Sequence, residues 1–128
     1  MKLVYLLPIL PPRHPECEAY SQEIALLQSR FGGRVVFVNP NQRLPLPIPR
    51  LGFGLTQLPS LRRAETEETI YHFFNPDPFA FPFLLGLRRP VVYTIAGGMD
   101  AQRANLRFFR RMAVVAVPDA RSLARLQA

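Results

Sequence analysis

The sequence predicts an α/β fold: a doubly wound, mainly parallel, Rossmann-like sheet of five to six strands with helices on both faces. Short apolar runs alternate along the chain with segments whose apolar residues recur at helical spacing, and this alternation is typical of parallel sheets. Residues 70–98 show the pattern most clearly, with an apolar run ended by prolines, a helix-length link, and a second apolar run ended by Gly97 and Gly98. We interpret this stretch as one βαβ unit that ends in a glycine turn.

The first part of the chain predicts two strands and the clearest helix. Residues 2–7 are a continuous apolar run, as expected for a strand that is buried on both faces. Residues 18–31 carry an apolar stripe at helical spacing, and the glycine pair that follows provides a left-handed stop. The predicted stripe consists of Tyr20, Ile24, Leu27 and Phe31. A second strand is expected at 34–39, ended by Pro40.

The remaining elements continue the alternation. Residues 41–60 are irregular because proline recurs at alternate positions, and Ser60 is the expected cap of a short helix through residue 67. Three further strands are expected, at 70–74, 90–95 and 113–117. Three further helices are expected, from about residue 81 with Pro82 at its first position, from Asp100 to residue 111, and from Asp119 onward. We expect parallel pairing, with 3-2-1-4-5 as a candidate strand order.

Composition bounds the fold more tightly than the function. The 128 residues, 48% of them apolar, suit one domain with a single core. The net charge is +7 and fifteen of the sixteen basic residues are arginine, which either favours anionic partners or reflects the base composition of the genome. The single cysteine, Cys17, excludes an intrachain disulfide, and no apolar run approaches the ~18 residues of a membrane span. We expect a cytoplasmic protein, with peripheral contact to the inner membrane face as an option.

Several blocks of the sequence resemble the amino-terminal domain of GT-B glycosyltransferases of the family 4 type. The first block is the opening strand and helix, followed by Arg-Val-Val-Phe-Val at 34–38. The second, Ile-Tyr-His-Phe-Phe-Asn-Pro at 70–76, is similar to the Asp-x-x-His-x-His strand end of that family. The third, Pro-Val-Val-Tyr-Thr-Ile-Ala-Gly at 90–97, is similar to its Pro-Val-Val-x-Thr-x-His-Gly, and residues 112–119 look like the strand before its serine turn.

The resemblance implies that residues 1–128 are the acceptor-binding half of an enzyme that moves a sugar from a nucleotide-sugar donor to a sugar or lipid acceptor. In that family a second Rossmann-like domain holds the donor, and we expect that domain to lie outside this chain. Catalysis of this kind depends on positioning the donor against the acceptor. We therefore expect negligible sugar transfer by this chain alone.

The loops that follow the strands supply the candidate substrate-binding residues: Gly97, Gly98, His72, Asn75, Arg13 and His14. The amides of the glycine pair can cradle an anion. His72 either contacts acceptor hydroxyls or is satisfied by a backbone carbonyl. Arg13 and His14 belong to a glycine-free loop, Pro-Pro-Arg-His-Pro, which either contacts a phosphate or is a stiff surface loop. Ala96 stands where the family has a histidine that contacts the sugar or acceptor, which indicates a divergent member.

The sequence identifies no catalytic residue and predicts no cofactor. Asp77 and Asp100 follow strand ends and either meet at the rim of a cleft or act as caps and turn residues. The two histidines have no neighbouring cysteine or carboxylate at ligand spacing, so no metal site is expected. No dinucleotide, Walker or nucleophile-elbow motif is found.

A second hypothesis is a non-catalytic α/β module that binds an anionic ligand, a membrane surface or a protein partner. The predicted helix at 100–111 has arginines on one face (Arg103, Arg107, Arg110 and Arg111) and an apolar stripe on the other (Ala101, Ala104, Phe108 and Met112). That stripe either faces the core or lies on a membrane, and the loop at 43–63 either folds on its own sheet, covers a partner domain or enters a membrane interface. Nucleic-acid binding is not expected, because the arginines are dispersed rather than interleaved with aromatic residues.

Overall fold

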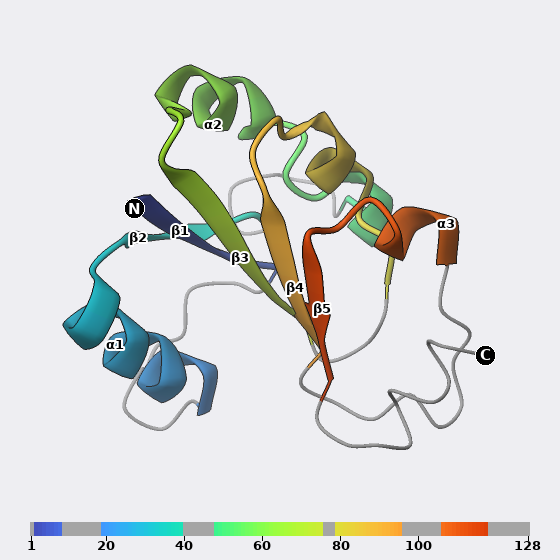
Figure 1. The fold of residues 1–128 in the computed structure, drawn as a ribbon. Helices are drawn as coiled ribbons and strands as arrows, with labels where there is room; N and C mark the ends of the chain where they lie inside the picture. Colours follow the sequence, from blue (N-terminus) through green and yellow to red (C-terminus); the bar gives the residue numbers. More distant parts are fainter. Residues whose placement is uncertain (1, 9–18, 40–47, 76–78, 96–105, 118–128) are drawn as a thin grey trace.

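The computed structural model describes residues 2–8, 19–39, 48–75, 79–95 and 106–117, and its centre is a sheet of five parallel strands (Figure 1). Neighbouring strands follow the order β2-β1-β3-β4-β5. All four strand pairs are parallel, which confirms the predicted fold class. The strands are β1 (Lys2–Leu7), β2 (Arg34–Phe37), β3 (Thr69–Asn75), β4 (Val91–Ile95) and β5 (Val114–Ala116).

The candidate order 3-2-1-4-5 is wrong, because β3 pairs with β1 and not with β2. β2 has only four residues, none of them fully buried, and its first residue, Arg34, is exposed. Such a strand suits the edge of a sheet, where one row of backbone groups faces outward. β1 is buried from Val4 to Leu7 and therefore takes a neighbour on each side.

Helical segments cover both faces of this sheet, as predicted (Figure 1). The helix α1 (Ala19–Phe31) packs on one face. The opposite face carries four shorter segments: η2 (Arg50–Gly52), α2 (Leu58–Ala64), η3 (Pro82–Gly86) and α3 (Leu106–Phe109). This distribution follows from the topology, because right-handed crossovers that step in opposite directions from β1 and β3 place their helices on opposite faces.

Two helical predictions need correction, and two others include residues that the structure does not describe. The helix expected from about residue 81 is a 3₁₀ helix of five residues, because Gly86 and Pro90 leave few positions after Pro82. The short helix begins at Leu58 rather than after Ser60, and Gln57 precedes it without a side-chain cap. Of the helix expected at 100–111, the described part is the four residues of α3, and the helix expected from Asp119 lies outside the described residues.

Two apolar clusters lie on the two faces of the sheet. The larger cluster joins the strands to α2, η3 and α3, and Phe73 at its centre has no exposed surface. Its ring lies 5.0 Å from the Phe81 ring, 4.9 Å from the Tyr93 ring and 6.0 Å from the Phe83 ring. The smaller cluster consists of Tyr5, Leu7, Ile24 and Phe74, with Leu27 packed against it. These contacts fix the sheet between its two layers.

The end of α1 is set by glycine, as predicted. Gly32 and Gly33 have φ angles of 71° and 108°, in the left-handed region that side chains disfavour. The hydroxyl of Tyr5 in β1 donates to the carbonyl of Gly32 at 2.9 Å, and this bond ties the turn to the sheet. The predicted stripe is correct for Ile24, but Phe31 at the last turn is 52% exposed, because the chain leaves the sheet there.

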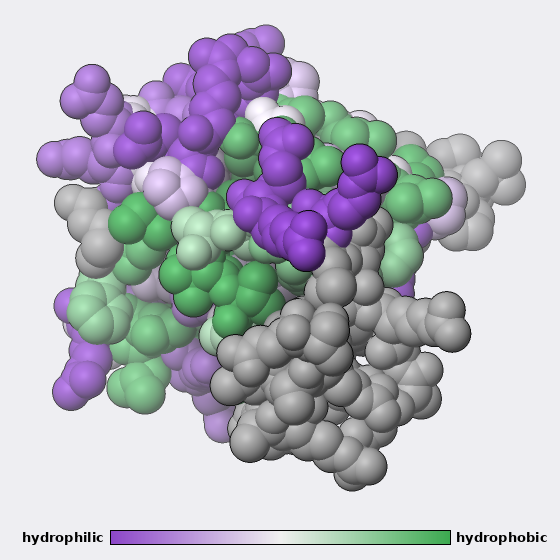
Figure 2. All heavy atoms as spheres, turned by 45° about the vertical axis from the view of Figure 1, so that its right-hand side comes forward, coloured by the Kyte–Doolittle hydropathy of each residue, from purple (hydrophilic) through white to green (hydrophobic). Residues whose placement is uncertain are grey.

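The arginine-bearing segment at 106–111 faces inward with its apolar side. Phe108 and Met112 are buried in the larger cluster, whereas Arg107, Arg110 and Arg111 are exposed. Part of the loop at 43–63 also folds on its own sheet, because its residue Phe53 is buried in the larger cluster. Large apolar side chains nevertheless stay at the surface, and Figure 2 shows hydrophobic surface directly beside strongly hydrophilic surface on this side of the molecule.

Candidate functional site

The carboxyl ends of β1, β3 and β4 meet at one edge of the sheet, because these three strands are neighbours and all run in the same direction. The chain leaves β1 for α1 on one face and leaves β3 for η3 on the other face. The topological switch point therefore lies between β1 and β3. Ligands of open parallel sheets bind in the crevice outside such a point.

Most of the predicted site residues belong to the segments that follow these strand ends. Arg13, His14, Gly97 and Gly98 lie outside the described residues. The same is true of Asp77, Ala96 and Asp100. The described part of the predicted site consists of His72 and Asn75, both in β3.

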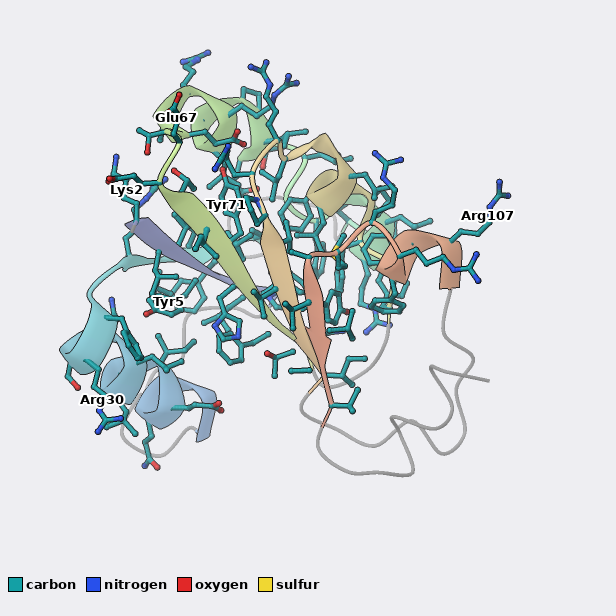
Figure 3. The ribbon with its side chains drawn as sticks, viewed as in Figure 1. Lys2, Tyr5, Arg30, Glu67, Tyr71 and Arg107 are labelled. Atoms are coloured by element: carbon teal, nitrogen blue, oxygen red, sulfur yellow. The ribbon has the colours of Figure 1, made fainter. Side chains whose placement is uncertain are left out.

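His72 lies half-buried on the face of the sheet that α1 covers. Its Nε2 atom is 2.8 Å from the Thr94 hydroxyl oxygen on the neighbouring strand β4. Its ring stacks on the Phe74 ring at 4.1 Å and lies 6.2 Å from the Tyr5 ring of β1 (Tyr5 is labelled in Figure 3). His72 thus has a side-chain hydroxyl as its partner, rather than the backbone carbonyl that sequence reasoning offered as an alternative.

Burial lowers the pKa of His72 below its ordinary value of 6.5, because the charged imidazolium loses solvation. The imidazole is therefore neutral at neutral pH, with one nitrogen as donor and the other as acceptor. Thr94 can donate or accept in the same pair. A neutral histidine beside a hydroxyl can bind the hydroxyl groups of a polyol, which are also both donors and acceptors.

Asn75 is part of the core rather than of an open site. It is 3% exposed, and its Nδ2 atom donates to the Tyr93 hydroxyl at 3.2 Å. The Tyr93 hydroxyl donates in turn to the carbonyl of Phe79 at 2.7 Å. This chain of hydrogen bonds joins the end of β3 to β4 and to the segment that enters η3. A buried amide in such a chain fixes the backbone, which is a structural role.

The structure does not bring His72 and Asn75 together. Side chains alternate between the faces of a strand, and positions 72 and 75 differ by an odd number. His72 consequently shares its face with Phe74 in the smaller cluster, whereas the side chain of Asn75 bonds to Tyr93 of the larger cluster. Any ligand that contacts the His72 side chain approaches from the α1 side.

Two polar partners were missed by sequence reasoning. Thr94 is the one hydroxyl residue in β4 besides Tyr93, and the two interrupt an otherwise aliphatic strand. A polar side chain in an aliphatic strand indicates a hydrogen-bond partner nearby, so the sequence held a signal for both residues. The sequence could not identify His72 and Asn75 as the hydrogen-bond partners of Thr94 and Tyr93. Which β3 side chains lie near them depends on the register, in which Phe74 is paired with Thr94, and register is a property of the folded sheet.

The described residues hold no group of three or more histidine, cysteine, aspartate or glutamate side chains that could bind a metal ion. Among these same residues, no helix has the length and apolar character needed to cross a membrane. Comparisons of the chain with protein-family models, curated proteins and solved structures found no match. The functional conclusion therefore depends on the residues and on their geometry.

Proposed function

We propose that this chain is the acceptor-binding half of a GT-B type glycosyltransferase and binds a sugar-type acceptor on the α1 side of the sheet, near the ends of β3 and β4. The observation that carries the proposal is the His72–Thr94 pair, 2.8 Å apart on this face of an all-parallel sheet. Sugar hydroxyls need mixed donors and acceptors on a partly apolar surface. The His72–Thr94 pair supplies the donors and acceptors, and its apolar neighbours supply the apolar surface.

The surface around the pair supports ligand access. Val92, Ala116 and Val114 lie on the same face of β4 and β5 by strand alternation and register, and Val114 is 53% exposed. In the described part of the chain, α1 packs near β1 and not near these residues. The described residues therefore leave this half of the face open, and the sequence blocks at 70–76 and 90–97 add the glycosyltransferase resemblance.

Binding is tested by NMR titration of the ¹⁵N-labelled chain with methyl glucoside and methyl mannoside. The expected result is a saturable shift of the resonances of His72, Thr94 and their neighbours, and its loss in the His72→Ala variant. The Arg30→Gln variant on the outer surface of α1 serves as the control. Shifts spread evenly over the surface, or shifts that persist unchanged in His72→Ala, would contradict the proposed acceptor site.

Transfer is tested separately, with radiolabelled nucleotide sugars and the same acceptors. We expect negligible turnover, because the groups that would position the donor belong to a second domain in this proposal. Robust turnover by this chain alone would contradict the assignment to an acceptor-binding half, while leaving the sugar-binding result intact.

A non-catalytic module that binds an anionic ligand is the second candidate function. A specific observation favours it: three arginines converge on one cavity at the opposite edge of the sheet, lined in part by Arg88, Arg89 and Arg111.

A further inference from the structure

Two cavities adjoin each other beside η3 and α3, and the first of them reaches the starts of β4 and β5. The first has a volume of about 390 Å³ and is lined by Arg88, Arg89 and Arg111 together with apolar side chains and the starts of the two strands. The second is a groove of about 720 Å³ between η2, η3 and α3. Leu85 and Arg111 line both cavities, so the two lie side by side.

Three arginines line the first cavity, and the Glu65 carboxylate outside its lining accepts from the Arg88 backbone N–H at 3.2 Å. None of its described lining residues is acidic. Arg89 is held in place because its Nη2 atom donates to the backbone carbonyl of Glu67 at 2.6 Å. Its Nε atom is buried and has no hydrogen-bond partner among the described residues. A buried donor on a charged group is costly when it is left unpaired. Because the Nε atom has almost no accessible surface, a bound oxyanion would meet the positive charge of the Arg89 guanidinium rather than this atom.

The second cavity is mainly apolar. Leu51 and Leu85 are 59% and 43% exposed, and they line this groove together with Phe79 and Phe108. Arg107 and Arg111 are its only described charged lining residues, and both are cationic. The Arg50 guanidinium also lies over the Phe79 ring, 4.0 Å from its centroid, at the side of the groove. The groove thus pairs exposed apolar surface with positive charge.

We propose that the two cavities form one binding site for an anionic amphiphile, that is, a phosphate-type head group joined to a single apolar chain. Guanidinium groups bind phosphate oxygens through paired hydrogen bonds, which suits Arg88, Arg89 and Arg111 around the head group. The apolar chain would cover Leu51 and Leu85 and remove them from water. The head-group cavity lies at the starts of β4 and β5, and the groove lies among segments of the face opposite to His72. The site is therefore independent of the proposed acceptor site, and it specifies a ligand for the second candidate function.

The test is calorimetric titration of the chain with three probes at concentrations below micelle formation: octyl phosphate, inorganic phosphate and octyl glucoside. We expect octyl phosphate to bind at least about tenfold more tightly than either other probe, because only octyl phosphate offers both the charge and the chain. NMR shifts in the wild-type chain should map to residues 84–91 and 107–113, which locates the site without any substitution.

Charge-matched variants separate this site from general attraction to a basic protein. Arg111→Gln should weaken octyl phosphate binding by about tenfold, since Arg111 lines both cavities. Arg30→Gln removes the same charge from α1, on the far side of the molecule from Arg107 of α3 (Figure 3), and should change the affinity less than about twofold. Both side chains are exposed, and thermal melts would verify that the variants fold.

Three results would overturn the proposal. The first is equal affinity for octyl phosphate and inorganic phosphate, which would exclude a role for the groove. The second is an equal loss of affinity in Arg111→Gln and Arg30→Gln, which would show general charge attraction. The third is binding to vesicles that contain phosphatidylglycerol without binding of monomeric octyl phosphate, which would assign this face to a membrane surface instead.

Discussion

The imidazole Nε2 atom of His72 lies 2.8 Å from the Thr94 hydroxyl oxygen, across the pair of strands at the centre of the sheet. Both side chains are half-buried on the α1 face, and the Phe74 ring stacks on the imidazole. Burial favours the neutral form of His72 and leaves a polar pair within an otherwise apolar surface. Protonation of His72 should therefore affect both the stability of the fold and the proposed binding site.

Replacing His72 with glutamine should flatten the pH dependence of stability in weakly acidic solution. The pKa of His72 is lowered in the folded state, so the unfolded chain takes up this proton first as the pH falls through about 6.5. The unfolded state then binds more protons than the native state, and the free energy of unfolding decreases with decreasing pH until the folded histidine also protonates. Urea denaturation at about pH 7.5 and about pH 5 measures the difference, which should be larger for the wild type than for His72→Gln.

The second histidine of the chain supplies the control for that measurement. His14→Gln removes a titrating group of the same kind, and the wild-type pH dependence should persist in this variant. A pH dependence that survives in His72→Gln and disappears in His14→Gln would contradict the assignment of the effect to His72.

Tyr93→Phe should lower the free energy of unfolding by about 1–3 kcal/mol. The hydroxyl that this substitution removes accepts from the Asn75 Nδ2 atom at 3.2 Å and donates to the Phe79 carbonyl at 2.7 Å. Tyr93 is fully buried and Asn75 is 3% exposed, so water cannot readily replace the lost hydroxyl. Urea denaturation would give the value.

A double-mutant cycle tests whether these bonds act as one unit. Asn75→Ala and Tyr93→Phe should be non-additive by at least about 0.5 kcal/mol, because they share one hydrogen bond. Additive effects would show that the buried amide is held by other contacts.

Gly33→Ala should destabilise the protein more than Gly32→Ala does. Both glycines have positive φ angles, which cost an alanine about 1–2 kcal/mol. A Cβ atom at Gly33 would also lie 2.7 Å from the Tyr5 ring and 2.8 Å from the Leu3 carbonyl oxygen, whereas one at Gly32 would meet nothing within 4 Å. The backbone carbonyl cannot rotate away, so the added overpacking should cost about 1–3 kcal/mol more. Equal midpoints of urea denaturation for the two variants would contradict the close approach.

The strands were predictable because their burial is written locally in the sequence. Continuous apolar runs at 2–7 and 70–74 predict strands covered on both faces, and they match β1 and β3 to within a residue. The order of the strands was not predictable in this way, because pairing joins segments that are distant along the chain.

The candidate site was harder to predict than the fold. Strand alternation alone already separates His72 from Asn75, and that parity was available from the sequence. The pairing of His72 with Thr94 depends on register, and the convergence of Arg88 and Arg89 with Arg111 depends on how α3 packs beside the start of β4. Neither arrangement has a local signature, because both are set by tertiary packing.

Phe73→Ala and Phe31→Ala together test where the core lies. Phe73 has no exposed surface and contacts three aromatic rings of the larger cluster, so its truncation should cost about 3–5 kcal/mol. Phe31 was predicted to be part of the buried stripe of α1, yet it is 52% exposed, and its truncation should cost less than about 1 kcal/mol. Urea denaturation midpoints of the two variants provide the comparison. A cost for Phe31→Ala that approaches that of Phe73→Ala would mean that the end of α1 is covered in solution, since only lost burial could account for it.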